Sequence, residues 1–257
     1  MEENLRNYPH KPDGGFWERD LASISRMLVR ADALTPELLA TKNDRFLYLN
    51  SGRALSCARE AYGLEKGDTL VLEFLRESNR SFRKQLEQRL PINDLNQYVN
   101  QLCVAIILGD AELTSRLSGL RRADYANANV AYPECVSQMA ECLALTVSGP
   151  FDAAQASLNT AFQSLTDESL SREERETVEE VLQALQAILS EDSPALSEVL
   201  SRRCQAAPGR LRDPRRRNLS EGAFDLLALG LAGLARERGM AVSVHSVYLP
   251  LELLKEG

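Results

Sequence analysis

The sequence is poor in the residues that most often build catalytic centres. It has two histidines, His10 and His245, and a single tryptophan. Metal sites and acid–base catalysis usually recruit several histidines at a fixed spacing. The motifs of zinc proteases, serine hydrolases, phosphate-binding loops and dinucleotide-binding folds are also absent. We therefore expect no enzymatic activity, no catalytic residue, no metal and no cofactor.

Long apolar runs are missing as well. No stretch approaches the 18 apolar residues of a membrane-spanning helix, and the first residues lack a basic segment followed by an apolar one. We therefore expect neither membrane insertion nor export. The cysteines are odd in number and form no Cys-x-x-Cys pair, which indicates buried thiols in a reducing cytoplasm. They are Cys57, Cys103, Cys135, Cys142 and Cys204.

The charge balance argues against one class of partner. The formal net charge is −7 and the isoelectric point is about 5.1. Direct binding to nucleic acid is driven by neutralising phosphates with cationic side chains, so an acidic chain is a poor candidate for it. An acidic surface favours a basic protein partner instead. Apolar residues make up 44% of the chain and charged residues 26%, which is typical of a folded globular protein.

Four turn signals recur at nearly constant spacing. They surround aspartates that are 42, 42 and 40 residues apart, and amphipathic helical patterns flank each of them. The glycine of these turns is expected to stop the first helix, and Asp or Ser to cap the second. The aspartates are Asp68, Asp110, Asp152 and Asp192. The sequence therefore predicts an all-α fold of stacked helical hairpins with a repeat of about 40 residues, either a solenoid-like stack or an irregular bundle.

We predict a single helical domain over residues 1–257. Residues 1–45 would form an N-terminal helix and cap, 46–208 the hairpins, 209–220 an arginine-rich loop, and 221–257 a C-terminal helix and closing strand. The C-terminal helix, 225–238, is rich in small residues that permit close helix packing, and Gly239 is placed to end it. The segment after it, "VSVHSVYLPLELL" at 242–254, predicts a short strand, although no pairing partner is evident. Its three valines would face inward and His245 would face solvent.

Two charged segments are candidate binding sites. Glu173, Glu174, Glu179 and Glu180 lie in an acidic stretch that opens a predicted helix, where acidic residues are also favoured for purely structural reasons. Their functional use would be an acidic docking surface for a basic protein partner. Arginines cluster over 202–217, a segment that could grip phosphate or an acidic protein, or could be a solvated loop. They are Arg202, Arg203, Arg210, Arg212, Arg215, Arg216 and Arg217.

The C-terminal region carries the most specific pattern. From Arg212 onward, about 40 residues combine an alanine-rich helix, Gly239, a strand-like segment, Tyr248-Leu249-Pro250 and a closing Leu-Leu. This arrangement resembles the end of the immunity protein 49 family of bacterial polymorphic toxin systems. The run Arg215 to Arg217 is not part of that resemblance.

The resemblance implies a cytoplasmic antidote used in interbacterial competition of the kind served by type VI secretion. Such a protein binds a cognate toxin domain, blocks its active site and needs no enzymatic activity. Two alternatives from other classes stay open. One is a helical-repeat scaffold for an endogenous partner, and the other, with less support, is an enzyme that reverses the toxin's modification. Under the first hypothesis, reversing the charge of the four glutamates together should slow association with the toxin.

Overall fold

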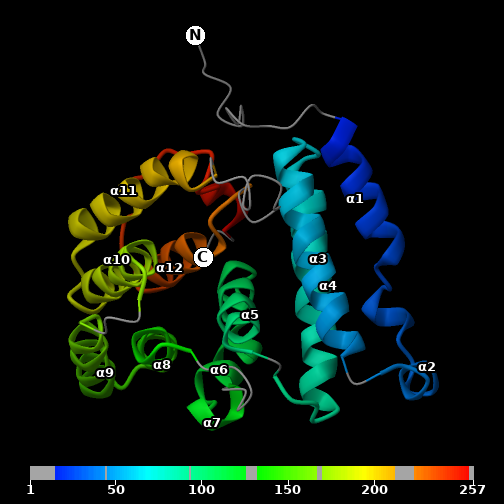
Figure 1. Cartoon of the computed structure of the whole chain (residues 1–257), viewed down its shortest axis with the longest axis horizontal. Coiled ribbons are helices and arrows are strands. Elements are labelled where there is room, and N and C mark those ends of the chain that lie inside the picture. Colours follow the sequence, from blue (N-terminus) through cyan, green and yellow to red (C-terminus); the bar gives the residue numbers. More distant parts are fainter. Residues whose placement is uncertain are drawn as a thin grey trace. The chain divides into compact units, whose positions relative to one another are not determined.

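The computed structural model describes residues 15–43, 45–92, 94–125, 132–166, 170–211 and 223–254. Throughout these residues the secondary structure consists of α-helices joined by turns and short 3-10 helices, and no strand occurs among them (Figure 1). The predicted all-α class is therefore confirmed. By their internal contacts, the residues fall into two compact units.

The first unit comprises Met1–Pro91, Cys204–Leu226 and Ser246–Lys255. Its long helices α3 and α4 lie side by side, and α1 packs against α3 (Figure 1). Its helices are α1 (Gly15–Met27), η1 (Ala31–Ala33), α2 (Pro36–Ala40), α3 (Phe46–Gly63), α4 (Asp68–Glu87) and η3 (Leu251–Leu253).

The closing segment of the chain is anchored on α3 within this unit. The Tyr62 hydroxyl donates a hydrogen bond to the Val247 carbonyl at 2.9 Å, and the Tyr62 ring meets Phe224 edge to face, with centroids 5.5 Å apart. The Asp225 N–H donates to the Tyr248 carbonyl at 2.9 Å. These contacts explain how an irregular segment is held in one place, because its backbone groups are bonded and its apolar side chains are buried.

The second unit comprises Ile92–Arg203, Leu227–His245 and Glu256–Gly257. Within it α8 packs on α9, α5 on α6, and α10 contacts both α8 and α9. Its helices are α5 (Leu95–Ile107), α6 (Ala111–Ser118), α7 (Arg122–Tyr125), α8 (Glu134–Ser148), α9 (Phe151–Ser164), α10 (Arg172–Leu189), α11 (Ser193–Leu211) and α12 (Leu226–Glu237). Helix α11 belongs to this unit as far as Arg203, and α12 from Leu227.

Helix α12 confirms the predicted close packing of small residues. A methyl group built on Gly230 would lie 2.8 Å from both Cβ and Sγ of Cys103 on α5, so only glycine fits there. Gly239 ends the helical segment with a φ of +75°, and Met240 N–H donates back to Ala235 carbonyl at 3.0 Å. This is the glycine-terminated helix end that the sequence predicts.

The four predicted turn signals all lie where one helix gives way to the next: α3 to α4, α5 to α6, α8 to α9 and α10 to α11. The side chains of Asp110 and Asp192 accept hydrogen bonds from N–H groups in the first turns of α6 and α11, as expected of helix caps. The prediction that glycine fills the left-handed position is wrong for the α3–α4 turn, and the α10–α11 turn contains no glycine. Glu65 and Glu191 adopt φ values of 54° and 55° there, since the hydrogen bonds that close the helix end offset the strain.

The predicted closing strand is not present. The side chains of residues 241–246 alternate in burial, with Val244 buried, Val242 half-buried and His245 exposed. These residues nevertheless form no β-ladder with another segment. A β-strand needs a neighbouring strand to satisfy its backbone, and none lies among the described residues. One of the backbone groups is bonded to a side chain instead, because the Ser243 N–H donates to the Ser197 hydroxyl at 3.2 Å.

Candidate functional site

The predicted acidic stretch forms the first half of α10. The helix begins at a capping box, in which the Ser171 hydroxyl accepts from the Glu174 N–H at 3.2 Å and the Glu174 carboxylate accepts from the Ser171 N–H at 3.0 Å. The Glu174 side chain therefore caps the start of the helix. The opposite face of α10 is apolar and buried, with Val178, Val181 and Leu182 among its residues.

Glu180 forms a shielded ion pair with α11. Its carboxylate lies 3.2 Å from a guanidinium nitrogen of Arg203, and the two side chains are only 13% and 8% exposed. A buried charge without a partner is costly, so each member of this pair holds the other in place. Glu180 joins α10 to α11 within the second unit, rather than projecting into solvent.

Three glutamates of α10, including Glu180, form one wall of an open hollow of about 370 Å³. We call this hollow the α10 ledge; it is lined by Glu176, Glu179, Glu180, Gln183 and Arg202. Local hydrogen bonds orient its carboxylates, because Glu176 accepts from Arg172 Nε at 2.7 Å and Glu179 accepts from Gln183 Nε2 at 3.1 Å. Arg202 in turn donates to the Gln183 side-chain carbonyl.

The structure thus brings the four predicted residues onto one helix but gives them different roles. Glu173 and Glu179 are exposed, Glu174 caps the helix and Glu180 is paired. Two residues of the ledge, Glu176 and Gln183, are not among the four predicted site residues. The signal was available, because positions 176, 179, 180 and 183 follow the i, i+3, i+4, i+7 spacing that places residues on one helix face.

The arginine cluster is divided. Arg202 and Arg203 lie on α11 and face α10 through the contacts just described. Helix α11 continues to Leu211, past residue 209, where the sequence predicts the start of a loop. The remaining backbone of that predicted loop and its arginines at 212 and 215–217 lie outside the described residues, as does the side chain of Arg210.

Among the described residues, no three His, Cys, Asp or Glu side chains are grouped to hold a metal ion. All five cysteines are buried and unbridged. Burial raises the pKa of Cys57 to about 11 and that of Cys142 to about 12, so these two thiols are protonated and unreactive at neutral pH.

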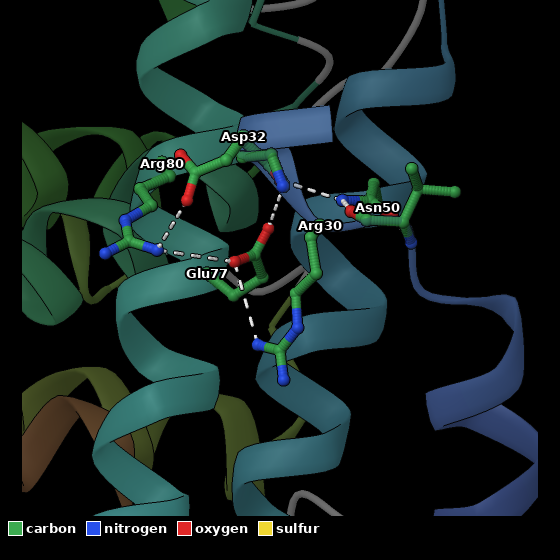
Figure 2. Close-up of polar contacts among 8 residues, drawn as sticks. Arg30, Asp32, Asn50, Glu77 and Arg80 are labelled. Carbon is green, nitrogen blue, oxygen red and sulfur yellow. Dashed lines mark hydrogen bonds and ion pairs between the residues drawn. The ribbon is translucent and has the colours of Figure 1, made fainter. Parts of the chain in front are cut away.

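The first unit contains a second polar cluster, which sequence reasoning missed entirely (Figure 2). Glu77 of α4, only 1% exposed, accepts a hydrogen bond from the Ala31 N–H and lies between Arg30 and Arg80, 3.7 Å and 3.8 Å from their guanidinium nitrogens. Arg80 also contacts Asp32 at 3.4 Å. This cluster joins α4 to the segment that precedes α2.

Asn50 of α3 completes the cluster. Its side-chain oxygen accepts from the Val29 N–H at 2.9 Å, and its side-chain nitrogen donates to the Val29 carbonyl at 2.8 Å (Figure 2). The only hint in the sequence is a set of polar residues at helical spacing on α4, Glu77, Ser78, Ser81 and Gln85, which are all buried. Buried polar groups at such positions require specific partners.

Fold and site together define an all-helical protein whose described residues include charged side chains suited to binding another protein. None of the described helices combines the length and apolarity needed to cross a membrane. Comparison with known families then gives a specific assignment. The chain belongs to the family described as Immunity protein 49, whose model matches residues 49–253. Comparisons with curated proteins and with solved structures give no match.

Proposed function

We propose that this protein neutralises a cognate bacterial toxin domain by binding it in the cytoplasm and covering its active site. The observation that carries the proposal is membership of the Immunity protein 49 family, with a match that extends over residues 49–253. The protein acts by forming a complex and uses neither a cofactor nor a chemical step of its own.

The proposed docking surface is the exposed part of the α10 ledge with the neighbouring Glu173. Three carboxylates and an amide line the hollow beside Arg202, so it presents acceptors for a cationic side chain. The net charge of −7 has the same sign as the ledge. Together these charges favour a basic toxin, and they would speed its association through long-range attraction.

The test replaces charges that have no part in helix capping or in the shielded pair. Glu176→Gln with Glu179→Gln removes two negative charges from the ledge and keeps Glu174 and Glu180. A matched control, Asp152→Asn with Glu191→Gln, removes two exposed charges elsewhere in the same unit. Glu191 lies twelve residues beyond Glu179, or about 18 Å along a helix.

Under this proposal the cognate toxin is expected to be encoded by an adjacent gene, and association rates with it should separate the two variants. At low salt, the ledge variant should associate about three- to ten-fold more slowly than the unaltered protein, and the difference should shrink at high salt. The control should stay within about two-fold. Equal rates for ledge variant and control would place the docking surface elsewhere.

A further inference from the structure

The segment that follows α12 has the pattern of a β-strand without a neighbouring strand. Residues 240–246 contain neither a turn nor a bend, and none of them has a positive φ. Within 241–245, the first, third and fifth side chains are exposed, and the two valines between them are half-buried and buried. A period of two is that of a β-strand, and valine is among the residues that favour strands. We call residues 241–245 the valine segment.

One edge of the valine segment is closed and the other is open. In an extended chain, the N–H and carbonyl of one residue point to the same edge, and those of the next residue point to the opposite edge. The Ser243 N–H donates to the Ser197 hydroxyl at 3.2 Å, so the edge to which it belongs faces α11. The N–H and carbonyl groups of Val242 and Val244 point the other way, and none of these four groups has a hydrogen-bond partner among the described residues. The open edge therefore presents two donors and two acceptors in a row.

The valine segment is held in place although no strand lies beside it. Val244 is 5% exposed, so its side chain is packed within the second unit. The residue before the segment, Met240, is also buried, and its N–H donates to the Ala235 carbonyl of α12 at 3.0 Å. Because these contacts fix the segment before a partner arrives, pairing with it costs little further loss of conformational freedom.

We propose that the open edge of the valine segment binds an extended strand of the cognate toxin domain through main-chain hydrogen bonds. A row of unpaired main-chain donors and acceptors is matched by the main chain of another strand, as in β-strand addition. The inference rests on the proposed toxin binding and gives it a contact of a different chemistry from that of the α10 ledge.

A second copy of this chain is a poorer occupant of the open edge. It carries the same net charge of −7 and therefore repels the first copy, whereas a basic toxin is attracted. A pair of strands as short as the valine segment is also too small to hold a dimer by itself. It can contribute to a larger interface, which a toxin domain would supply.

Amide hydrogen exchange of the full-length chain, resolved by residue with NMR, tests the pairing. In the free protein, the Val242 and Val244 amides should exchange within about ten-fold of the rate of an unstructured peptide, and far faster than amides in the middle of α10. Saturation with the toxin domain from the product of the adjacent gene should slow both at least about ten-fold. The other three amides of the segment should change by less than about three-fold, because they point to the edge that faces α11.

Proline substitution gives an independent test with a matched control. Val242→Pro removes one donor from the open edge and should weaken toxin binding about ten-fold. Ala241→Pro removes the neighbouring donor from the closed edge and should leave the affinity within about two-fold of that of the unaltered protein. Circular dichroism checks that both variants keep their helices, and the exchange measurement on the unaltered protein decides if either does not.

The outcomes separate this inference from the proposed function. A complex in which all five amides slow alike, or none does, overturns the pairing and leaves toxin binding intact, as do equal affinities of the two folded proline variants. Strong protection of the Val242 and Val244 amides in the free protein also overturns it, and a dependence of that protection on protein concentration would identify a second copy as the occupant. If no complex forms at all, the proposed function fails and this inference fails with it.

Discussion

The shielded pair of Glu180 and Arg203 allows the clearest energetic prediction. The charged groups are 3.2 Å apart and about nine-tenths buried, so removing one leaves the other charge poorly solvated. Breaking a fully buried pair costs about 3–5 kcal/mol, and an exposed pair contributes at most about 1 kcal/mol. Glu180 also borders the open ledge, and its side chain keeps 13% exposure there. We therefore expect Glu180→Gln and Arg203→Met each to cost about 2–3 kcal/mol.

A double-mutant cycle in urea measures this pair directly. Because each single variant removes this ion pair and keeps one of its two charges, the double variant should cost less than the sum of the single ones, with a coupling of about 1–2 kcal/mol. The analysis assumes a single cooperative transition, which coincident fluorescence and circular dichroism curves would verify. Single variants that each lose under about 0.5 kcal/mol, or strictly additive effects, would refute the view that this pair fixes α10 on α11.

Two further predictions concern the second unit. Gly230→Ala should destabilise the protein by about 1–3 kcal/mol, because its methyl group meets Cys103 at 2.8 Å. The control Gly52→Ala, in an open part of α3, should be neutral or stabilising by up to about 1 kcal/mol. Similar unfolding midpoints for the two variants would contradict the close packing at Gly230. Glu134, whose pKa Arg122 lowers to about 2, contributes stability that is present above its ordinary pKa of 4.5 and lost as pH falls towards 2. The Glu134–Arg122 pair is half-exposed, so Glu134→Gln should cost less than about 1 kcal/mol at neutral pH. In acid titrations this stability difference should shrink as the pH falls from 4.5 towards 2. A constant difference would refute the lowered pKa of Glu134.

The helices and their ends could be predicted because their signals are local. Asp110 and Asp192 cap the helices that follow them, and Gly239 ends the helical segment before it, through contacts within a few residues. The closing strand was a wrong prediction for the complementary reason. The alternation of 242–247 specifies which side chains turn inward, but a strand also needs a partner, and that depends on the rest of the fold.

The candidate sites were only partly predictable for the same reason. The acidic stretch of α10 was evident, yet the role of Glu180 depends on Arg203, 23 residues further along the chain. The role of Glu77 was barely indicated by sequence patterns, since its carboxylate accepts a hydrogen bond from a backbone N–H 46 residues away and backbone groups leave no signature in side-chain composition. Whether the hairpins repeat regularly as a solenoid stays a prediction.

The most direct test of the proposed function is to mix the purified protein with its cognate toxin domain, sought first in the product of the adjacent gene, and to measure complex formation and toxin activity together. We expect a stable complex with a Kd of about 10 nM or below, and toxin activity that falls in proportion to the fraction bound. Activity that persists in the saturated complex would contradict neutralisation by occlusion. Failure to form a complex, with cells lacking this protein indifferent to the toxin, would contradict the immunity function itself.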